Sequence, residues 1–181
     1  MGKIAGANVD STDDGLLAAA QAGNHEAFLF LYNRHGRSIF NFLYRLLNSE
    51  TAAEDISHDC FIDLIRKPDH FKSNHDSLLI QLYRRGRDLA VQYVNEIGES
   101  NPSPSREHTD ELHHGLADRE VVKTAINRLP LPEREVLILF EYQGLSLNEI
   151  AFIVGSDHDM VAVRLNDARR SLRDQLSRYL S

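Results

Sequence analysis

Residues 144–173 read GLSLNEIAFIVGSDHDMVAVRLNDARRSLR, and this stretch decides the fold of the last third of the chain. It contains two segments in which apolar residues recur every three or four positions, and Gly155 stands between them. Ser146 and Ser156 each stand three residues before an acidic residue, a pattern typical of the first turn of a helix. Two helix starts so close together predict a short helix, a turn and a second helix, which is a helix-turn-helix.

The rest of the chain also carries helical patterns. Apolar residues recur at three- and four-residue spacing in residues 28–46, 53–64, 78–97, 121–129 and 136–140. Asn24 is expected to cap the first of these helices, and Thr51, three residues before Glu54, is expected to cap the second. Strand-like alternation is not evident in the sequence. We therefore predict an all-α protein.

A polar segment separates the two halves of the chain. Residues 98–114 read GESNPSPSREHTDELHH, which contains too few apolar side chains to form a core. Residues 96–118 hold six acidic residues and a single arginine. We therefore predict two small helical domains, residues 1–97 and 116–181, joined by a flexible acidic linker at residues 98–115.

The charge is distributed unevenly along the chain. The formal net charge of −7 at pH 7 argues at first sight against nucleic acid, because phosphate binding depends on Lys and Arg. The distribution matters more than the sum. From Arg164 to the last residue there are five arginines and two aspartates. This basic segment is the predicted DNA contact, and Arg164, Arg169 and Arg170 are expected to touch phosphates.

The second helix of the predicted helix-turn-helix is the candidate for base contacts. Residues near the N-terminus of this helix enter the major groove in such motifs. The base-contacting residues that we predict are His158, Asp159, Val161 and Ala162. Asp157 and Asp159 would repel DNA unless they cap the helix or accept hydrogen bonds from cytosine amino groups, and capping is the favoured interpretation.

The sequence predicts no covalent chemistry, cofactor or bound metal. It has no phosphate-binding loop, nucleophile elbow or paired cysteines, so we predict that the protein is not an enzyme. His108, His113 and His114 stand near two acidic residues, but solvated histidines are favoured over a zinc site in a polar linker. Cys60 is expected to be a small buried hydrophobe. Without a secretion signal or an apolar run of about 18 residues, the protein is expected to be cytoplasmic and to have no membrane span.

Five motifs can be compared with known families. The C-terminal ones are L-P-x-x-x-R-E-V-L at 129–137, G-L-S-x-x-E-I-A at 144–151 and V-x-x-R-L-x-x-A-R-x-x-L-R at 161–173. By themselves they also resemble the helix-turn-helix of LuxR-type response regulators. In the first half, residues 14–32 read DGLLAAAQAGNHEAFLFLY and residues 53–61 follow A-E-D-I-x-H-D-x-F. In this order the motifs resemble the extracytoplasmic-function (ECF) sigma factors of bacterial RNA polymerase.

The resemblance implies a transcription initiation factor that directs core RNA polymerase to promoter DNA. The first domain would be a sigma core-type helical bundle that binds the polymerase and the downstream promoter element, and the last would bind the upstream element. In the third helix, Tyr83, Arg84 and Arg87 are expected at the melted downstream element, because an aromatic ring and arginines suit single-stranded DNA. A place in the core is an equal alternative for Tyr83. The resemblance also implies an anti-sigma factor as a partner.

An acidic edge is predicted on the second long helix. Glu54, Asp55, Asp59 and Asp63 stand three or four residues apart, beside the apolar face. Such an edge is usually only a solvated surface. In the resembling family this segment grips the polymerase clamp, and the matching positions are Asp55, His58, Asp59 and Phe61. The predicted polymerase-binding residues are therefore Glu54, Asp55, His58, Asp59, Phe61 and Asp63.

Four residues of the third long helix depart from the family pattern, namely Gln81, Asp88, Asn95 and Glu96. The family commonly has a tryptophan, an asparagine and a basic pair there, so a stacking surface and positive charge are missing. One alternative is therefore a sigma mimic that binds an anti-sigma factor without initiating transcription, although the arginines of the last helix argue against it. Another is an ordinary helix-turn-helix regulator with an unrelated sensor bundle, which leaves the acidic edge unexplained.

Overall fold

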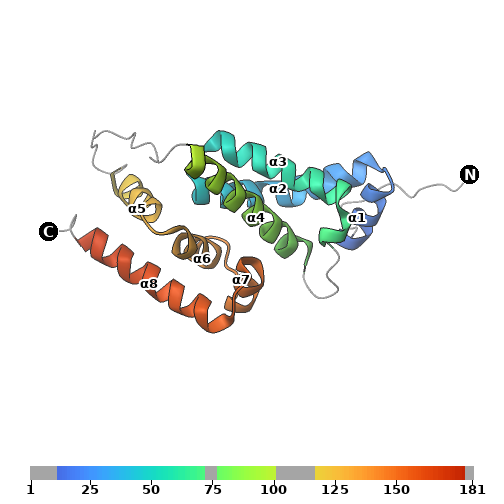
Figure 1. Ribbon diagram of the computed structural model, residues 1–181. Coiled ribbons are helices and arrows are strands. Elements are labelled where there is room, and N and C mark those ends of the chain that lie inside the picture. The colour runs from blue at the N-terminus through green and yellow to red at the C-terminus, as the bar shows by residue number, and fades with distance from the viewer. Residues whose placement is uncertain (1–11, 72–76, 101–116, 178–181) are drawn as a thin grey trace, which may run out of the picture. The chain divides into compact units, whose positions relative to one another are not determined.

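The computed structural model describes residues 12–71, 77–100 and 117–177 (Figure 1). These residues form helices and the turns between them, without a strand, so the all-α prediction is confirmed. In chain order the elements are α1 (Asp13–Gln21), α2 (His25–Leu47), α3 (Glu50–Arg66), the short 3-10 helix η1 (Pro68–Phe71), α4 (Leu78–Ser100), α5 (Ala117–Asn127), α6 (Leu131–Glu141), α7 (Leu147–Val154) and α8 (His158–Ser177).

The chain divides into two compact units, Met1–Ala90 and Val91–Ser181. The division falls within α4, and this helix continues to Ser100, three residues into the predicted linker. The reason is local: a helix usually ends before the residue that precedes a proline, and the first proline of this segment is Pro102. The remainder of the predicted linker, from residue 101 onward, lies outside the described residues. The domain limits at residues 97 and 116 stay a prediction.

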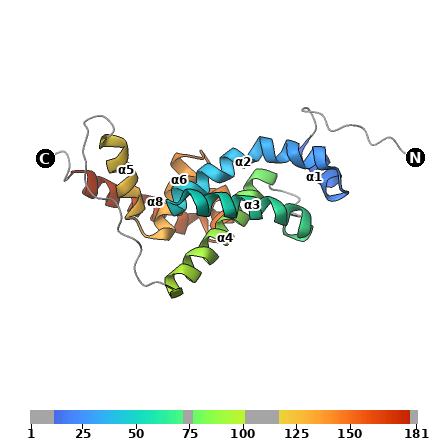
Figure 2. The ribbon, with the colours of Figure 1, turned by 90° about the horizontal axis from the view of Figure 1, so that it is seen from above.

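The first unit is assembled around α2. This helix packs against α1 and α3, and both views show α1 at one end of the α2–α3 pair (Figure 1, Figure 2). Large side chains that are fully buried in this unit include Leu31, Ile39, Phe42, Leu43, Leu46, Phe61, Leu64 and Leu82. Burying each such side chain contributes about 1.5–3 kcal/mol, so these helices hold together mainly through their apolar faces.

Capping residues set where the helices of the first unit begin. The side chain of Asn24 accepts a hydrogen bond from the Ala27 backbone at 3.1 Å, as the sequence predicted for the start of α2. The prediction for α3 was wrong, because its cap is Ser49, whose hydroxyl accepts from the Ala52 backbone at 3.3 Å. Asn48 ends α2 in the left-handed conformation, with φ of 51°, so α3 begins at once and Thr51 lies inside it.

The second unit contains the predicted helix-turn-helix. Helix α8 packs against α5, α6 and α7, and Figure 1 shows it running along all three. Gly155 ends α7 in the left-handed conformation, with φ of 65°, which glycine adopts without steric cost. The chain then turns through Ser156 and Asp157 into α8.

Among the described residues, no helix is both long and apolar enough to span a bilayer.

The two predicted helix starts around the turn differ in the structure. Ser146 and Glu149 form a complete capping box, in which Glu149 accepts from the Ser146 backbone at 2.8 Å and donates its own backbone N–H to the Ser146 hydroxyl at 3.3 Å. At the second start Asp157 is the cap, because its carboxylate accepts from the Met160 backbone at 2.7 Å. Ser156 therefore does not take the capping position that the sequence predicted.

This difference gives a test of the second unit. Ser146→Ala is expected to lower the free energy of unfolding by about 1 kcal/mol, because the first turn of α7 loses the acceptor for the Glu149 backbone N–H. Ser156→Ala is the matched control and is expected to change it by less than about 0.5 kcal/mol. Urea denaturation followed by circular dichroism measures both values. Equal losses in the two variants would contradict the assigned caps.

Candidate protein and nucleic-acid interfaces

An acidic surface is exposed on α3. Glu54, Asp55, His58 and Asp59 all lie on the solvent side of this helix, while Ala53, Ile56 and Cys60 between them are buried. Residues three and four positions apart on a helix are neighbours, so these side chains form one continuous surface. We call these four residues the α3 acidic surface. Its carboxylates are available to a basic partner.

Two residues predicted for polymerase binding belong to the core instead. Phe61 is fully buried, and its ring meets the Tyr32 ring edge-on with centroids 5.0 Å apart. Asp63 is only 7% exposed. Both residues lie on the side of α3 that carries Cys60 and Leu64, which packs into the unit. Including Phe61 and Asp63 in the polymerase surface was therefore wrong.

Asp63 forms a largely buried ion pair with α4. Its carboxylate accepts from Arg85 Nε at 2.8 Å and from a second guanidinium nitrogen of Arg85, and Lys67 Nζ lies 3.0 Å away. Burial raises the pKa of Asp63, but the hydrogen bonds from Lys67 and Arg85 outweigh burial, so the pKa lies below its ordinary value. The carboxylate therefore stays ionised and joins α3 to α4.

Sequence reasoning missed one member of the acidic side of α3. Glu50 is exposed and stands one turn before Glu54, so it extends the α3 acidic surface toward the start of the helix. The same four-residue spacing that identified the other acids could have found it, once the helix start was placed at Ser49 instead of Thr51.

The surface of α4 that was predicted to bind single-stranded DNA does not include the ring of Tyr83. Tyr83 is 2% exposed, and its ring meets the Phe42 ring edge-on with centroids 5.4 Å apart. Burial raises the pKa of Tyr83 to about 12. Of the two interpretations of Tyr83, burial therefore supports the core and not the contact with DNA. Arg84 is exposed, and Arg87 is partly exposed and lies 3.4 Å from the Asp88 carboxylate, so the two arginines remain on the surface.

The departures from the family pattern do not all face solvent. Asp88, Asn95 and Glu96 are exposed on α4, and Glu96 accepts a hydrogen bond from Gln92 at 2.9 Å. Gln81 is only 7% exposed. The exposed departures therefore make the outer side of α4 acidic and polar, whereas the Gln81 side chain is part of the interior.

The two acidic residues at the start of α8, Asp157 and Asp159, have different contacts. Asp157 caps the helix through the Met160 backbone, which confirms the favoured interpretation for this residue. The Asp159 side chain is 99% exposed, and its carboxylate lies 3.3 Å from His158 Nδ1. Val161 is fully buried, so its assignment as a base contact was wrong. The reason is the helical period, which places position 161 on the same side as the buried Leu165.

The side of α8 opposite its buried residues is a defined surface. Val161, Leu165 and Ala168 are buried, and the residues that lie opposite them at three- and four-residue steps are Asp159, Val163, Asn166 and Arg170, all exposed. We call these four residues the α8 outer stripe. Sequence reasoning missed Val163 and Asn166, although the spacing of the apolar positions in α8 was enough to place them there.

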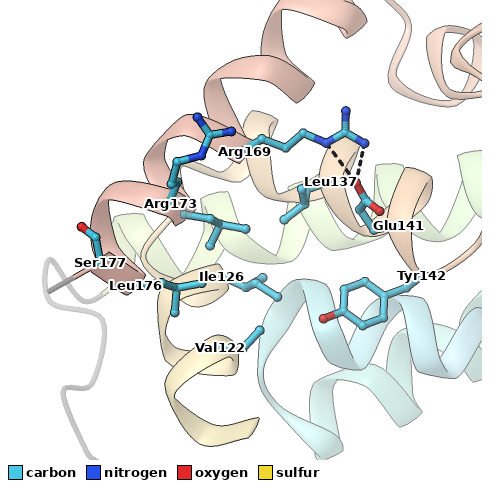
Figure 3. Close-up of a pocket in the computed structure, with 10 residues that line it drawn as sticks. Val122, Ile126, Leu137, Glu141, Tyr142, Arg169, Arg173, Leu176 and Ser177 are labelled. Carbon is cyan, nitrogen blue, oxygen red and sulfur yellow. Dashed lines mark hydrogen bonds and ion pairs between the residues drawn. The ribbon is translucent and has the colours of Figure 1, made fainter. Parts of the chain in front are cut away.

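The three arginines predicted for phosphate contact have different surroundings. Arg170 has a side chain that is 71% exposed and lies 3.3 Å from Asp167. Arg164 is partly buried. Arg169 donates two hydrogen bonds to Glu141, at 3.0 and 2.6 Å (Figure 3). Its guanidinium also lies over the Phe140 ring, 5.1 Å from the ring centroid. Arg169 would have to leave this carboxylate to reach a phosphate, and Arg170 is the most accessible of the three.

The C-terminal half of α8 also lines an open apolar groove of about 580 Å³. Its apolar lining comes from α5, α6 and α8, namely Val122, Ile126, Leu137, Leu172 and Leu176 (Figure 3). Glu141, Arg169 and Arg173 add charges to the lining. Helix α8 thus contributes to two surfaces, the outer stripe near its start and the groove near its end.

The described residues contain no cluster of His, Cys, Asp and Glu that could hold a metal ion. The zinc alternative concerned three histidines of the predicted linker, and these lie outside the described residues: His108, His113 and His114.

Cys60 is fully buried, as predicted, and burial raises the pKa of its thiol to about 12. The thiolate is therefore essentially absent at neutral pH, which excludes an activated cysteine at this position.

Comparison with known proteins gives matches in both halves. The family model of Sigma-70 region 2 matches residues 31–96, and that of Sigma-70 region 4 matches residues 119–172. The RNA polymerase sigma factor NccH of Alcaligenes xylosoxydans xylosoxydans is 31% identical over 180 residues, which cover 90% of this chain and 93% of that protein. The ECF RNA polymerase sigma factor SigE of Mycolicibacterium smegmatis is 23% identical over 83% of this chain, and the chain spans 62% of its length.

A solved structure shares the fold. The sigma factor RpoE from Bartonella quintana, solved in complex with the anti-sigma factor NepR, is similar with a TM-score of 0.70 at 22% identity, covering 83% of this chain and 96% of that one. The region 2 match precedes the region 4 match along the chain, which is the order that the sequence motifs predicted. With a 31% identical relative matched over nearly its whole length, the chain belongs to the ECF sigma factors of RNA polymerase.

Proposed function

We propose that this protein directs core RNA polymerase to promoters and initiates transcription there. The observation that carries the proposal is that one chain presents two exposed surfaces. The α3 acidic surface lies within its Sigma-70 region 2, and the α8 outer stripe lies within its Sigma-70 region 4. The first surface suits a basic protein partner, and the second suits duplex DNA. The covalent chemistry of transcription belongs to the polymerase, and the protein acts in the cytoplasm beside it.

The polymerase binds at the α3 acidic surface in this proposal. Its members are exposed without being needed for the core, in contrast to Asp63 one turn beyond Asp59. Opposite charges across an interface raise the association rate and fix the orientation of the partners. The carboxylates of Asp55 and Asp59 would therefore meet basic side chains of the polymerase clamp.

The upstream promoter element binds at α8. Arg170 is well exposed on the outer stripe and Arg164 lies partly exposed nearer the start of the helix, so both can neutralise phosphates beside a major groove. His158, Asp159 and Ala162 remain candidates for base contacts at the N-terminal end. Asp159, which does not cap the helix, has the chemistry to accept from a cytosine amino group.

Helix α4 offers fewer contacts to the downstream promoter element than the sequence predicted. Arg84 and Arg87 supply positive charge on α4, but the ring of Tyr83 is not available for base stacking. Asp88 lies beside Arg87 and offsets part of its charge. We therefore propose that α4 contacts the backbone of the melted strand, and that base capture depends on other residues.

A second candidate function is the sigma mimic. The exposed Asp88, Asn95 and Glu96 favour it, because a protein that only binds an anti-sigma factor has no need of a basic α4. One structural relative, RpoE, was solved with an anti-sigma factor, NepR, and we propose an anti-sigma factor as a partner of this chain as well. The exposed Arg170 argues for DNA binding and so against the mimic.

Run-off transcription with purified core polymerase and a library of candidate promoters tests the proposal. The double variant Asp55→Lys with Asp59→Lys is expected to reduce defined transcripts by more than about tenfold, because like charges then meet at the polymerase interface. The matched control is Asp14→Lys with Glu26→Lys, which changes the net charge equally at exposed acids of α1 and α2. Thermal unfolding confirms that both variants are folded.

Each other outcome selects a different function. Polymerase binding or anti-sigma binding without transcripts from the unaltered protein would establish the mimic. Sequence-specific duplex binding that is unaffected by polymerase would establish an ordinary helix-turn-helix regulator. Equal losses in the acidic-surface variant and its control would show that net charge, and not the α3 acidic surface, is responsible.

A further inference from the structure

The α8 outer stripe contains two residues whose presence the fold does not explain. Val163 is 53% exposed, and Asn166, one turn further along, is also exposed. Both residue types are poor helix formers, each costing roughly 0.5 kcal/mol relative to alanine in a helix interior. Val163 recovers little of this cost through burial, in contrast to the fully buried Val161 two residues earlier. A stability argument would place alanine, glutamate or lysine at both positions.

The side chains of Val163 and Asn166 both suit contacts with an A·T base pair. In the major groove, thymine presents a C5-methyl group that apolar side chains contact, and adenine presents the N6 donor and N7 acceptor that asparagine binds with two hydrogen bonds. Residues three apart on a helix have Cβ atoms about 5–6 Å from each other, which lets Val163 and Asn166 reach the same or adjacent base pairs.

Charges of both signs lie along this stripe: Asp159 is 99% exposed at its start, and Arg170 near its end lies 3.3 Å from Asp167. Arg170 is the residue of the stripe that can meet a phosphate. Arg170 follows Asn166 by one turn on the outer stripe, and its side chain is 71% exposed. Asp157, the carboxylate closest to the turn, is occupied by capping the helix. Candidate base-contacting side chains, followed one turn later by an exposed arginine on the second helix of a helix-turn-helix, fit a major groove, with bases in the middle and phosphates at the edge.

We propose that Val163 and Asn166 read an A·T-containing step of the upstream element, Val163 through the thymine methyl group and Asn166 through adenine N6 and N7. The inference rests on the proposed function, because it specifies how the DNA surface of that function recognises its sequence. It also replaces the buried Val161 as the apolar base contact of α8.

The test begins with the full-length protein bound to core polymerase. A randomised duplex library is selected for binding, which defines the preferred upstream sequence. Duplexes are then made with uracil in place of each thymine, which removes only the C5-methyl group, and with 7-deazaadenine in place of each adenine, which removes only the N7 acceptor. Affinities are measured for the unaltered protein and for Val163→Ala and Asn166→Ala.

We expect one thymine at which uracil weakens binding by the unaltered protein about threefold to fourfold, the value of one buried methyl group. In Val163→Ala, thymine and uracil should bind equally at that position. At a neighbouring adenine, 7-deazaadenine should weaken binding about tenfold, and Asn166→Ala should abolish this difference. Met160→Ala is the control, because Met160 is exposed on α8 but lies off the outer stripe, so its base preferences should match those of the unaltered protein.

Three results would overturn the inference. If Val163→Ala keeps the thymine preference, the methyl contact comes from another residue, although the proposed function stands. If Val163→Ala loses polymerase binding and keeps all base preferences, Val163 belongs to a protein interface. If the unaltered protein selects no sequence at all, the inference and the DNA-binding part of the proposed function fail together.

Discussion

Asp63→Asn is expected to lower the free energy of unfolding of the first unit by about 3 kcal/mol. Asparagine has nearly the same shape but no charge, so the Arg85 guanidinium, whose side chain is only 19% exposed, is left without its counterion. Lys67 loses its partner as well, but it is half exposed and can turn to water. Urea denaturation at pH 7 measures the change.

The same ion pair predicts how acid affects the protein. The pKa of Asp63 is below its ordinary value in the folded state, whereas an unfolded aspartate titrates near about 3.9. The pair therefore stabilises the fold fully above that pH, and its contribution is lost as the pH falls through the lower, folded-state pKa. Stability should decline more steeply in acid in the unaltered protein than in Asp63→Asn.

Asp59→Asn is the matched control, because Asp59 stands one turn earlier on α3 and is exposed. It should leave the unfolding midpoint unchanged and weaken polymerase binding. If Asp63→Asn unfolded within about 0.5 kcal/mol of the unaltered protein, the ion pair with Arg85 would not hold α3 against α4 in solution.

Tyr83→Ala is expected to destabilise the first unit by about 3–5 kcal/mol. The ring is 2% exposed and packs edge-on against Phe42, so its removal leaves a cavity that the rigid α2 cannot fill. Against a total stability of about 5–15 kcal/mol for a domain, such a loss leaves a measurable unfolded fraction near physiological temperature. Thermal unfolding monitored by circular dichroism gives the value.

The neighbouring arginine is the control for Tyr83. Arg84 is exposed on the same helix, so Arg84→Ala should change the melting temperature little and reduce affinity for single-stranded promoter DNA in the polymerase complex. A Tyr83→Ala variant with unchanged stability and weakened DNA binding would restore the role in DNA binding that the sequence predicted for this residue.

Local rules were enough to predict the helices of this protein. The cap at Asn24, the capping box of Ser146 and Glu149 and the glycine turn at Gly155 all occur where the sequence places them. Each of these features depends on hydrogen bonds within a few residues, so no knowledge of distant packing is needed. Where two caps compete within a few residues, as Ser49 and Thr51 do, the end of the preceding helix decided between them.

The sites were predictable only in part, because a residue's role depends on which side of its helix is buried. For α3, spacing grouped Asp63 with Asp55 and Asp59, but only the packing of α4 shows that Asp63 faces Arg85. For α4, the arginines around Tyr83 indicated a DNA surface, but the ring of Tyr83 packs edge-on against the Phe42 ring.

The sequence by itself determined that the chain is helical, that it has two halves and that a helix-turn-helix lies near its end, because periodicity, caps and turn residues act over short distances. The tertiary structure alone decided which residues face a partner. Burial is a property of neighbours that are remote in sequence, so Phe61, Asp63, Tyr83 and Val161 became core, while Val163 and Asn166 remained exposed on α8.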